Sequence, residues 1–284
     1  MDRPLKETVY TPDSELLSFG SLLHSMWNDL LASRELAWRL LVRNISAQYR
    51  QSLLGYAWAF LPPLFTTAIW VFLQSQKVFN VADPGMPYPV FVLTGTVLWQ
   101  TFVEALQAPL NAVSESKGML TKINFPREAL ILMGVGQVLF NFSIRVLVLI
   151  PVFWWFDVGL HISVLLVPLG VMGLILLGTS IGLSLTPLGM LYQDIGRALS
   201  FGTQALFFLT PIIYPVPQAS WAGLLVRLNP VTPLLETTRE WLVTGTASQL
   251  TGFIWVTFAS LLLLCISWVL YRISMPHLIS RMSA

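Results

Sequence analysis

The chain has 284 residues, of which 55% are apolar and only 11% are charged, and its formal net charge at neutral pH is +2. Together with a mean hydropathy of +0.69, this composition excludes a water-soluble globular core and indicates a polytopic membrane protein. The single cysteine, Cys265, excludes an intrachain disulfide and a thiolate metal cluster.

Residues 27–52 precede the first long apolar stretch and predict an amphipathic helix at a membrane interface. Apolar side chains such as Trp27, Trp38 and Val42 recur along one side at helical spacing. The basic residues of the opposite side are Arg39, Arg43 and Arg50. Two roles remain open, a basic anchor in the interface and a lever that contacts a cytoplasmic partner.

Long apolar stretches then predict six transmembrane helices, because each reaches the roughly 20 residues that a helix needs to cross the hydrocarbon layer. We place these spans at residues 53–76, 90–114, 129–156, 162–187, 197–216 and 251–272. The expected fold class is therefore an all-α polytopic membrane protein with one six-helix domain at 53–272.

The first and fifth spans each carry a face that mixes aromatic and hydroxyl side chains at helical spacing. The residues of these faces are Tyr56, Phe60, Thr67 and Trp70 in the first span and Thr203, Phe207, Thr210 and Tyr214 in the fifth. Lipid does not reward hydroxyl groups, so we expect both faces to meet protein or a water-accessible path. Ordinary packing and a path remain open, and such a path would suit a sugar chain. Pro62 and Pro63 should bend or locally open the first span.

Two isolated charges, Glu104 in the second span and Arg145 in the third, interrupt apolar sequence. Without a partner, each would cost roughly 2.5–3.5 kcal/mol by insertion scales. We expect the two to pair, either within one chain or between protomers. A proton relay is the weaker alternative, because no chain of further acids or histidines accompanies them.

The loop between the second and third spans predicts a short amphipathic helix at residues 114–125. Its apolar side includes Met119, and the charged residues around that side are Glu115, Lys117, Lys122 and Arg127. So short a helix has few residues of its own to cover an apolar side. We therefore favour a docking surface for a partner over a solvated loop.

Two further features lie in the second half of the chain. Gly178 and Gly182 form a GxxxG pair in the fourth span, a signal of close helix packing and weak evidence for dimerisation. Residues 217–245 are too apolar for a free linker and too interrupted, by Pro230 among others, to span a membrane. They predict two short re-entrant outer helices before the last span, which would close the top of the bundle or gate it.

Lys and Arg are distributed unevenly over the predicted loops. With six spans both termini lie on one side, and twelve of the 16 basic residues fall in the terminal segments and the loops of that side. By the positive-inside rule, both termini are cytoplasmic, with tails at 1–26 and 273–284. The first twenty residues contain Asp2, Asp13 and Glu15 and lack an apolar core, so we expect no cleaved signal peptide.

Motifs of catalysis are missing from the sequence. It contains no GxxxxGK[ST] phosphate loop, no HExxH and no GxSxG, and its histidines, His24, His161 and His277, are widely separated. We therefore predict no catalytic residues, no metal site and no ATP hydrolysis by this chain itself.

Five motifs occur together and in one order. They are YRQSLLGYAWAFLPPL at 49–64, INFPREAL at 123–130, QDIGR at 193–197, FLTPIIYP at 208–215 and NPVTPLLETTREWL at 229–242. This set resembles the membrane-spanning permease subunits of bacterial ABC exporters for polysaccharides, the group that serves O-antigen, teichoic acid and capsule. The resemblance covers about residues 34–245.

The resemblance implies a homodimer in the bacterial inner membrane, bound to two copies of a cytoplasmic ATPase subunit. That subunit would bind ATP and Mg, and this chain would hold no cofactor and bind no nucleic acid. The amphipathic helix would act as a lever at the cytoplasmic gate, the segment from Glu115 to Arg127 would couple to the ATPase, and a lipid-linked polysaccharide would follow the aromatic faces. Permeases for drugs or small lipids share this fold and remain an alternative. An integral-membrane transferase is less favoured, because it would need clustered acids or a histidine at a membrane surface.

Overall fold

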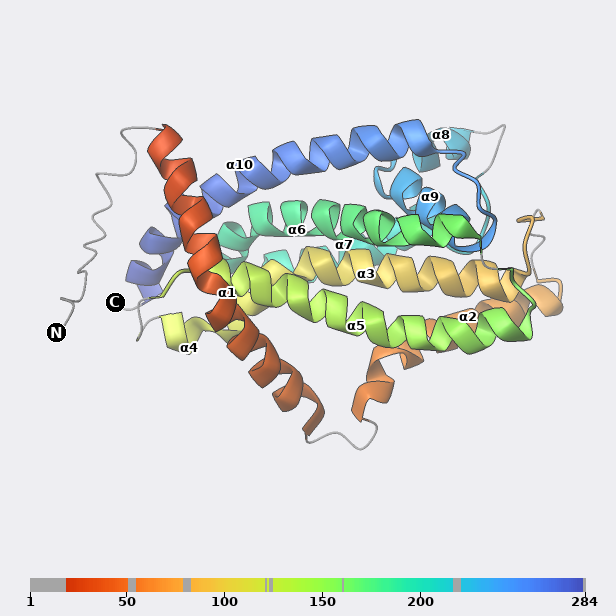
Figure 1. Ribbon diagram of the computed structural model, residues 1–284, viewed down its shortest axis with the longest axis horizontal. Helices are drawn as coiled ribbons and strands as arrows, with labels where there is room; N and C mark the ends of the chain where they lie inside the picture. The colour runs from red at the N-terminus through yellow and green to blue at the C-terminus, as the bar shows by residue number, and fades with distance from the viewer. Residues whose placement is uncertain are drawn as a thin grey trace.

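The computed structural model of the protein describes residues 19–50, 55–78, 83–120, 122, 125–159, 161–216 and 221–282. All regular secondary structure in these residues is helical (Figure 1). The long helices are α1 (Phe19–Arg50), α3 (Tyr88–Glu115), α5 (Glu128–Trp155), α6 (Val167–Leu191) and α10 (Leu250–Met282). The shorter elements are the 3₁₀ turns η1 (Gly55–Ala59) and η2 (Ile162–Leu166) and the helices α2 (Leu61–Ser75), α4 (Lys117–Leu120), α7 (Asp194–Leu209), α8 (Trp221–Leu228) and α9 (Val231–Val243).

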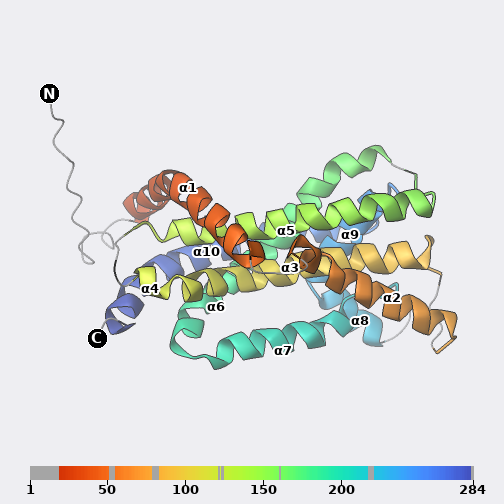
Figure 2. The same cartoon turned by 90° about the horizontal axis from the view of Figure 1, so that it is seen from below.

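Within the described residues, four helical segments are long and apolar enough to cross a membrane: α3, α5, η2 with α6, and α10. They run along the long axis of the molecule (Figures 1 and 2). These segments coincide with the second, third, fourth and sixth predicted spans, which supports a polytopic α-helical membrane protein. α10 also continues to Met282, so the predicted tail at 273–284 is helical over most of its length.

α2 and α7 are shorter than the predicted first and fifth spans, and prolines set both limits. Pro62 and Pro63 occupy the first turn of α2, where a missing N–H breaks no helical hydrogen bond. They begin this helix, and the helical structure of the predicted first span is interrupted between η1 and α2, in agreement with the predicted bend or local opening. α7 ends at Leu209 because Thr210, the residue before Pro211, adopts an extended backbone with φ −107° and ψ 137°.

The centre of the bundle is the contact between α3 and α6. A Cβ atom added at Gly178 of α6 would lie 2.7 Å from the carbonyl oxygen of Phe102, and one added at Gly182 would collide with the carbonyl oxygen of Leu106. Only glycine permits two helix backbones to approach so closely. The GxxxG pair therefore serves packing within the chain, and not the dimerisation that the motif suggested.

α1 crosses the bundle obliquely at the end where α4 and the end of α10 lie, called here the α4 end (Figure 1). Leu40 and Leu41 are buried in a cluster with residues of α5 and α10. Trp27 and Trp38 are instead 57% and 65% exposed, so the predicted apolar stripe divides into a packed side and a side free for a membrane interface. α1 begins at Phe19, before the predicted start, and the rest of the predicted tail lies outside the described residues.

The opposite end, called here the α9 end, is closed by α9. Leu234 is fully buried, and Arg239 is only 2% exposed. Nη2 of Arg239 donates to the carbonyl oxygens of Pro211 and Ile212 at 2.8 and 3.3 Å, and its guanidinium lies 3.9 Å above the ring of Phe91. Burial lowers the pKa of Arg239 to about 10, so the side chain remains charged at neutral pH. Both short helices that were predicted before the last span are present.

Candidate functional site

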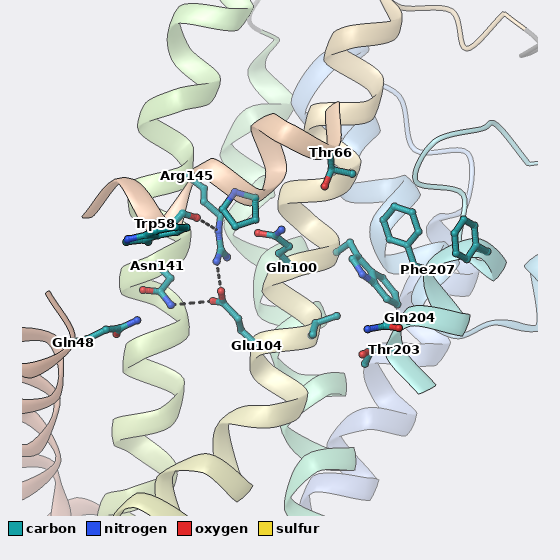
Figure 3. Close-up of a pocket in the computed structure, with 15 residues that line it drawn as sticks. Gln48, Trp58, Thr66, Gln100, Glu104, Asn141, Arg145, Thr203, Gln204 and Phe207 are labelled. Atoms are coloured by element: carbon teal, nitrogen blue, oxygen red, sulfur yellow. Dashed lines mark hydrogen bonds and ion pairs between the residues drawn. The ribbon is translucent and has the colours of Figure 1, made fainter. Parts of the chain in front are cut away.

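A cavity of about 600 Å³ lies on one face of α3 and α5, between η1 and α2 on one side and α7 on the other. In Figure 3 its floor carries Gln100 and Glu104 of α3 beside Asn141 and Arg145 of α5. The side chains that line it from η1 and α7 include Trp58, Thr203, Gln204 and Phe207. The cavity therefore places aromatic rings next to neutral polar groups.

Glu104 and Arg145 meet at the floor of this cavity. Nη2 of Arg145 forms an ion pair with Glu104 of the same chain, and Nε of Arg145 donates to the carbonyl oxygen of Ala59 at 2.9 Å. Asn141 donates to the second carboxylate oxygen of Glu104 at 3.2 Å. The side chain of Arg145 is 3% exposed and that of Glu104 is 30% exposed, so the pair presents its carboxylate to the cavity. The structure thus brings the two predicted partners together within one protomer.

The contact with Ala59 also fixes the chain before α2. Ala59 is the last residue of η1, and Trp58 beside it reaches the cavity. A guanidinium held by both a carboxylate and a carbonyl oxygen has two directional contacts. Arg145 therefore couples the position of η1 to the floor formed by α3 and α5.

A second cavity of about 590 Å³ continues from the first towards the α4 end. The two cavities share Gln48, Glu104 and Asn141. The second is lined from α1, α3 and α5 by carboxamides and by Glu115, whose carboxylate accepts a hydrogen bond from Asn44 at 3.2 Å. Together the cavities form one surface along α3 that mixes polar and apolar groups.

A row of polar side chains on α3 forms the floor of both cavities. Its members are Gln100, Glu104, Gln107, Asn111 and Glu115. Steps of four, three, four and four residues place them on one face of a helix. Sequence analysis missed this row because it treated Glu104 as an isolated charge, although the spacing of the amides was the available signal.

The eight predicted path residues separate into three groups. Thr203 and Phe207 line the first cavity, where the rings of Phe207 and Trp99 are 6.1 Å apart. Thr67 and Thr210 are buried inside the protomer, and Thr210 donates to the carbonyl oxygen of Leu206 in α7. The remaining residues lie outside this cavity, exposed or partly buried, and are Tyr56, Phe60, Trp70 and Tyr214. The two predicted faces therefore do not form one continuous wall in this protomer.

Residues 35–243 match the family of ABC-2 type transporters. The chain belongs to that family. The family is the transmembrane permease component of ABC transporters. This membership confirms the resemblance carried by the sequence motifs, and it agrees with the apolar helices of an integral membrane protein.

Three relatives of this ABC-2 chain are named as export or transport proteins. The O-antigen export system permease protein RfbA of Klebsiella pneumoniae is 25% identical over 209 residues, which cover 72% of this chain and 78% of that protein. The protein of the same name from Myxococcus xanthus is 26% identical over 211 residues, covering 73% and 80%. The polysialic acid transport protein KpsM of Escherichia coli is 24% identical over 237 residues, covering 82% and 91%. The similarity thus extends over most of each chain.

The residues predicted to contact an ATPase belong to α1 and to the segment around α4 of this ABC-2 transporter. Met119 and Arg127 are partly buried, and burial lowers the pKa of Arg127. Arg50 ends α1, and its side chain lies outside the described residues. The predicted helix at 114–125 is shorter than expected, because α3 runs on to Glu115 and α4 is a single turn. The exposed members of the set are Arg39, Arg43, Glu115, Lys117 and Lys122.

An ion cluster that sequence analysis missed joins three helices at the α4 end. Arg272 of α10 lies 2.8 Å from Asp29 of α1 and 3.0 Å from Glu128 of α5. The hydroxyl group of Tyr271 donates to the carbonyl oxygen of Arg127 at 3.4 Å. One arginine between carboxylates of two other helices fixes α1 on the bundle of this ABC-2 chain.

Proposed function

We propose that the chain is the permease subunit of an ABC exporter that moves a polysaccharide, carried on a lipid, outward across the bacterial inner membrane. The observation that carries this proposal is the row of polar side chains on α3 that lines both cavities, in a chain that belongs to the ABC-2 family. The names of the relatives, which refer to O-antigen and to polysialic acid, support a polysaccharide as the cargo.

The chemistry of the first cavity suits a sugar chain. Sugar rings expose C–H faces that pack on aromatic side chains, and Trp58, Trp99 and Phe207 supply such rings. Sugar hydroxyls exchange hydrogen bonds with carboxamides, and Gln100 and Gln204 supply those. Because these contacts are neutral and individually weak, they can hold a polymer without preventing its movement.

The cavities lie at the flank of one protomer, and we propose that a second copy completes their wall in a homodimer. In this arrangement α2 and α7 complete a set of six spans, the α4 end faces the cytoplasm with both termini, and the α9 end faces outward. The exposed charges of the α4 end then meet two copies of an ABC ATPase, which bind ATP and Mg. Family membership supports the pairing with an ATPase.

The proposal is tested by deleting the gene in its host and purifying the tagged chain from the complemented strain. We expect surface polysaccharide to disappear and to accumulate in the cytoplasm, and an ABC ATPase subunit to co-purify with the tagged chain. Complementation with Gln100→Leu together with Gln204→Leu should restore ATPase binding and leave export reduced. Unchanged surface polysaccharide after deletion, or purification without any ATPase subunit, would contradict the proposal.

A further inference from the structure

Six carboxamide side chains line the surface along α3 between the ion pair and the α4 end, and they are called here the amide track. The track consists of Asn44 and Gln48 of α1, Gln107 and Asn111 of α3, and Gln137 and Asn141 of α5. Between them the cavity is lined by the small residues Ala47, Ala108, Ala112 and Gly134, and by Met133 and Val138. Small residues leave the carboxamides accessible from the cavity of about 590 Å³.

The carboxamides of the track are arranged to exchange hydrogen bonds. Nε2 of Gln137 donates to Gln48 at 3.1 Å and to Asn141 at 3.3 Å. Oε1 of Gln137 is buried and has no hydrogen-bond partner among the described residues. This oxygen is enclosed by protein and lies out of reach of a ligand. The polar atoms of the track that do line the cavity suit hydroxyl groups, because a carboxamide can both accept from a hydroxyl and donate to it.

The accessible charge of the surface is negative. Among the described residues that line the two cavities, only Glu104, Glu115 and Arg145 are charged. Arg145 and Glu104 neutralise each other in their ion pair, which leaves the exposed carboxylate of Glu115 as the unbalanced charge among these residues. Along the described lining of the two cavities, a chain of carboxylated or phosphorylated sugars would therefore meet like charge and no accessible guanidinium or ammonium group.

We infer that the amide track binds a neutral, hydroxyl-rich glycan and disfavours an anionic one. This inference rests on the proposed function and narrows its substrate class. The similarity to a polysialic acid transport protein does not decide the matter, because it gives no account of the charges along this surface. The preference for a neutral glycan comes from hydrogen bonds that any hydroxyl can make and from repulsion between an anionic glycan and the carboxylates of the surface. This repulsion weakens as salt screens the carboxylates.

The test uses the full-length chain in nanodiscs and two probes of equal length, a linear glucose heptasaccharide and a galacturonic acid heptasaccharide. Dissociation constants are measured by NMR saturation transfer at low and at physiological salt. We expect the neutral probe to bind about tenfold more tightly at low salt, and the difference to shrink as salt rises. Gln107→Leu and Asn111→Leu should each weaken binding of the neutral probe by about fivefold.

Two further variants sharpen the experiment. Glu115→Gln keeps the oxygen that accepts from Asn44 and removes one accessible charge, so it should lower the preference for the neutral probe by at least about threefold. Gln76→Leu changes an exposed amide outside both cavities and should bind like the wild type. Melting temperatures report whether each variant is folded.

Equal or tighter binding of the acidic probe, absence of binding by the neutral probe, or unchanged binding in folded Gln107→Leu and Asn111→Leu would each overturn the inference. The proposed function is tested by separate experiments. It depends on co-purification of an ATPase subunit and on the deletion phenotype, neither of which uses the heptasaccharides. If the chain binds its ATPase and supports export but shows no preference for the neutral probe, the inference is overturned and the proposed function is not.

Discussion

Replacing Glu104 by glutamine should destabilise the protein more than replacing its partner Arg145 by methionine. The side chain of Arg145 is 3% exposed, so Glu104→Gln leaves a buried guanidinium without a counter-charge, at a cost of about 3–5 kcal/mol. In Arg145→Met, the carboxylate of Glu104 remains open to water in the cavity and keeps its hydrogen bond from Asn141. The loss is then about 1–3 kcal/mol, mainly because the carbonyl oxygen of Ala59 loses its donor.

The double variant separates this interaction from local damage. With both charges removed, the two single losses should together exceed the loss in the double variant by about 0.5–3 kcal/mol. The free energy of unfolding of all four proteins is measured by denaturant titration in detergent micelles. Arg39→Met provides the control, because its pair with Glu35 is about three-quarters exposed and contributes at most about 1 kcal/mol. Additivity within about 0.5 kcal/mol, or a larger loss for Arg145→Met than for Glu104→Gln, would refute the reasoning.

Three further perturbations test the packing, the ion cluster and the cavity. Gly182→Ala should lower the free energy of unfolding by about 1–3 kcal/mol through overpacking. The control, Gly202→Ala, should not lower it, because an added Cβ there meets open space. Equal effects of the two substitutions would contradict the close contact of α6 with α3. Arg272→Gln leaves two carboxylates facing each other and should speed amide hydrogen exchange in α1, and unchanged exchange would show that the cluster does not hold that helix. In a cysteine-free background, Gln100→Cys should react with a water-soluble maleimide faster than Ile266→Cys on the exposed side of α10, and the reverse order would show that the cavity is not reached by water.

Apolar run length predicted much of the fold. The four long spans follow from long, predominantly apolar stretches, which indicate that a helix can cross hydrocarbon. The limits of α2 and α7 were missed because the same runs continue past the points where Pro63 and Pro211 change the backbone. The sequence alone does not distinguish a proline that starts a helix from a proline that bends one. The residues that pack around a proline determine which of these roles it has.

The candidate site was predicted in part. Glu104 and Arg145 were recognisable because charge is rare in apolar sequence, whereas carboxamides attract less notice and the row on α3 was overlooked. Thr210 has the spacing of a wall residue, but its hydroxyl is used inside the protomer. The ion cluster of Arg272 joins residues far apart in the sequence, and no local pattern indicates which helices meet there.

The two faces of α3 explain why its polar row needs further protein or water around it. The face that carries Phe102 and Leu106 is filled by α6 so closely that glycines are required, and this contact fixes the rotation of α3 in the bundle. The opposite face, from Gln100 to Glu115, consequently cannot turn inward. A row of amides and carboxylates in hydrocarbon would leave its polar groups unsatisfied, at a cost that no lipid contact offsets. The packing of α3 on α6 therefore requires a polar environment along the other face, as a water-accessible path beside a second protomer would supply.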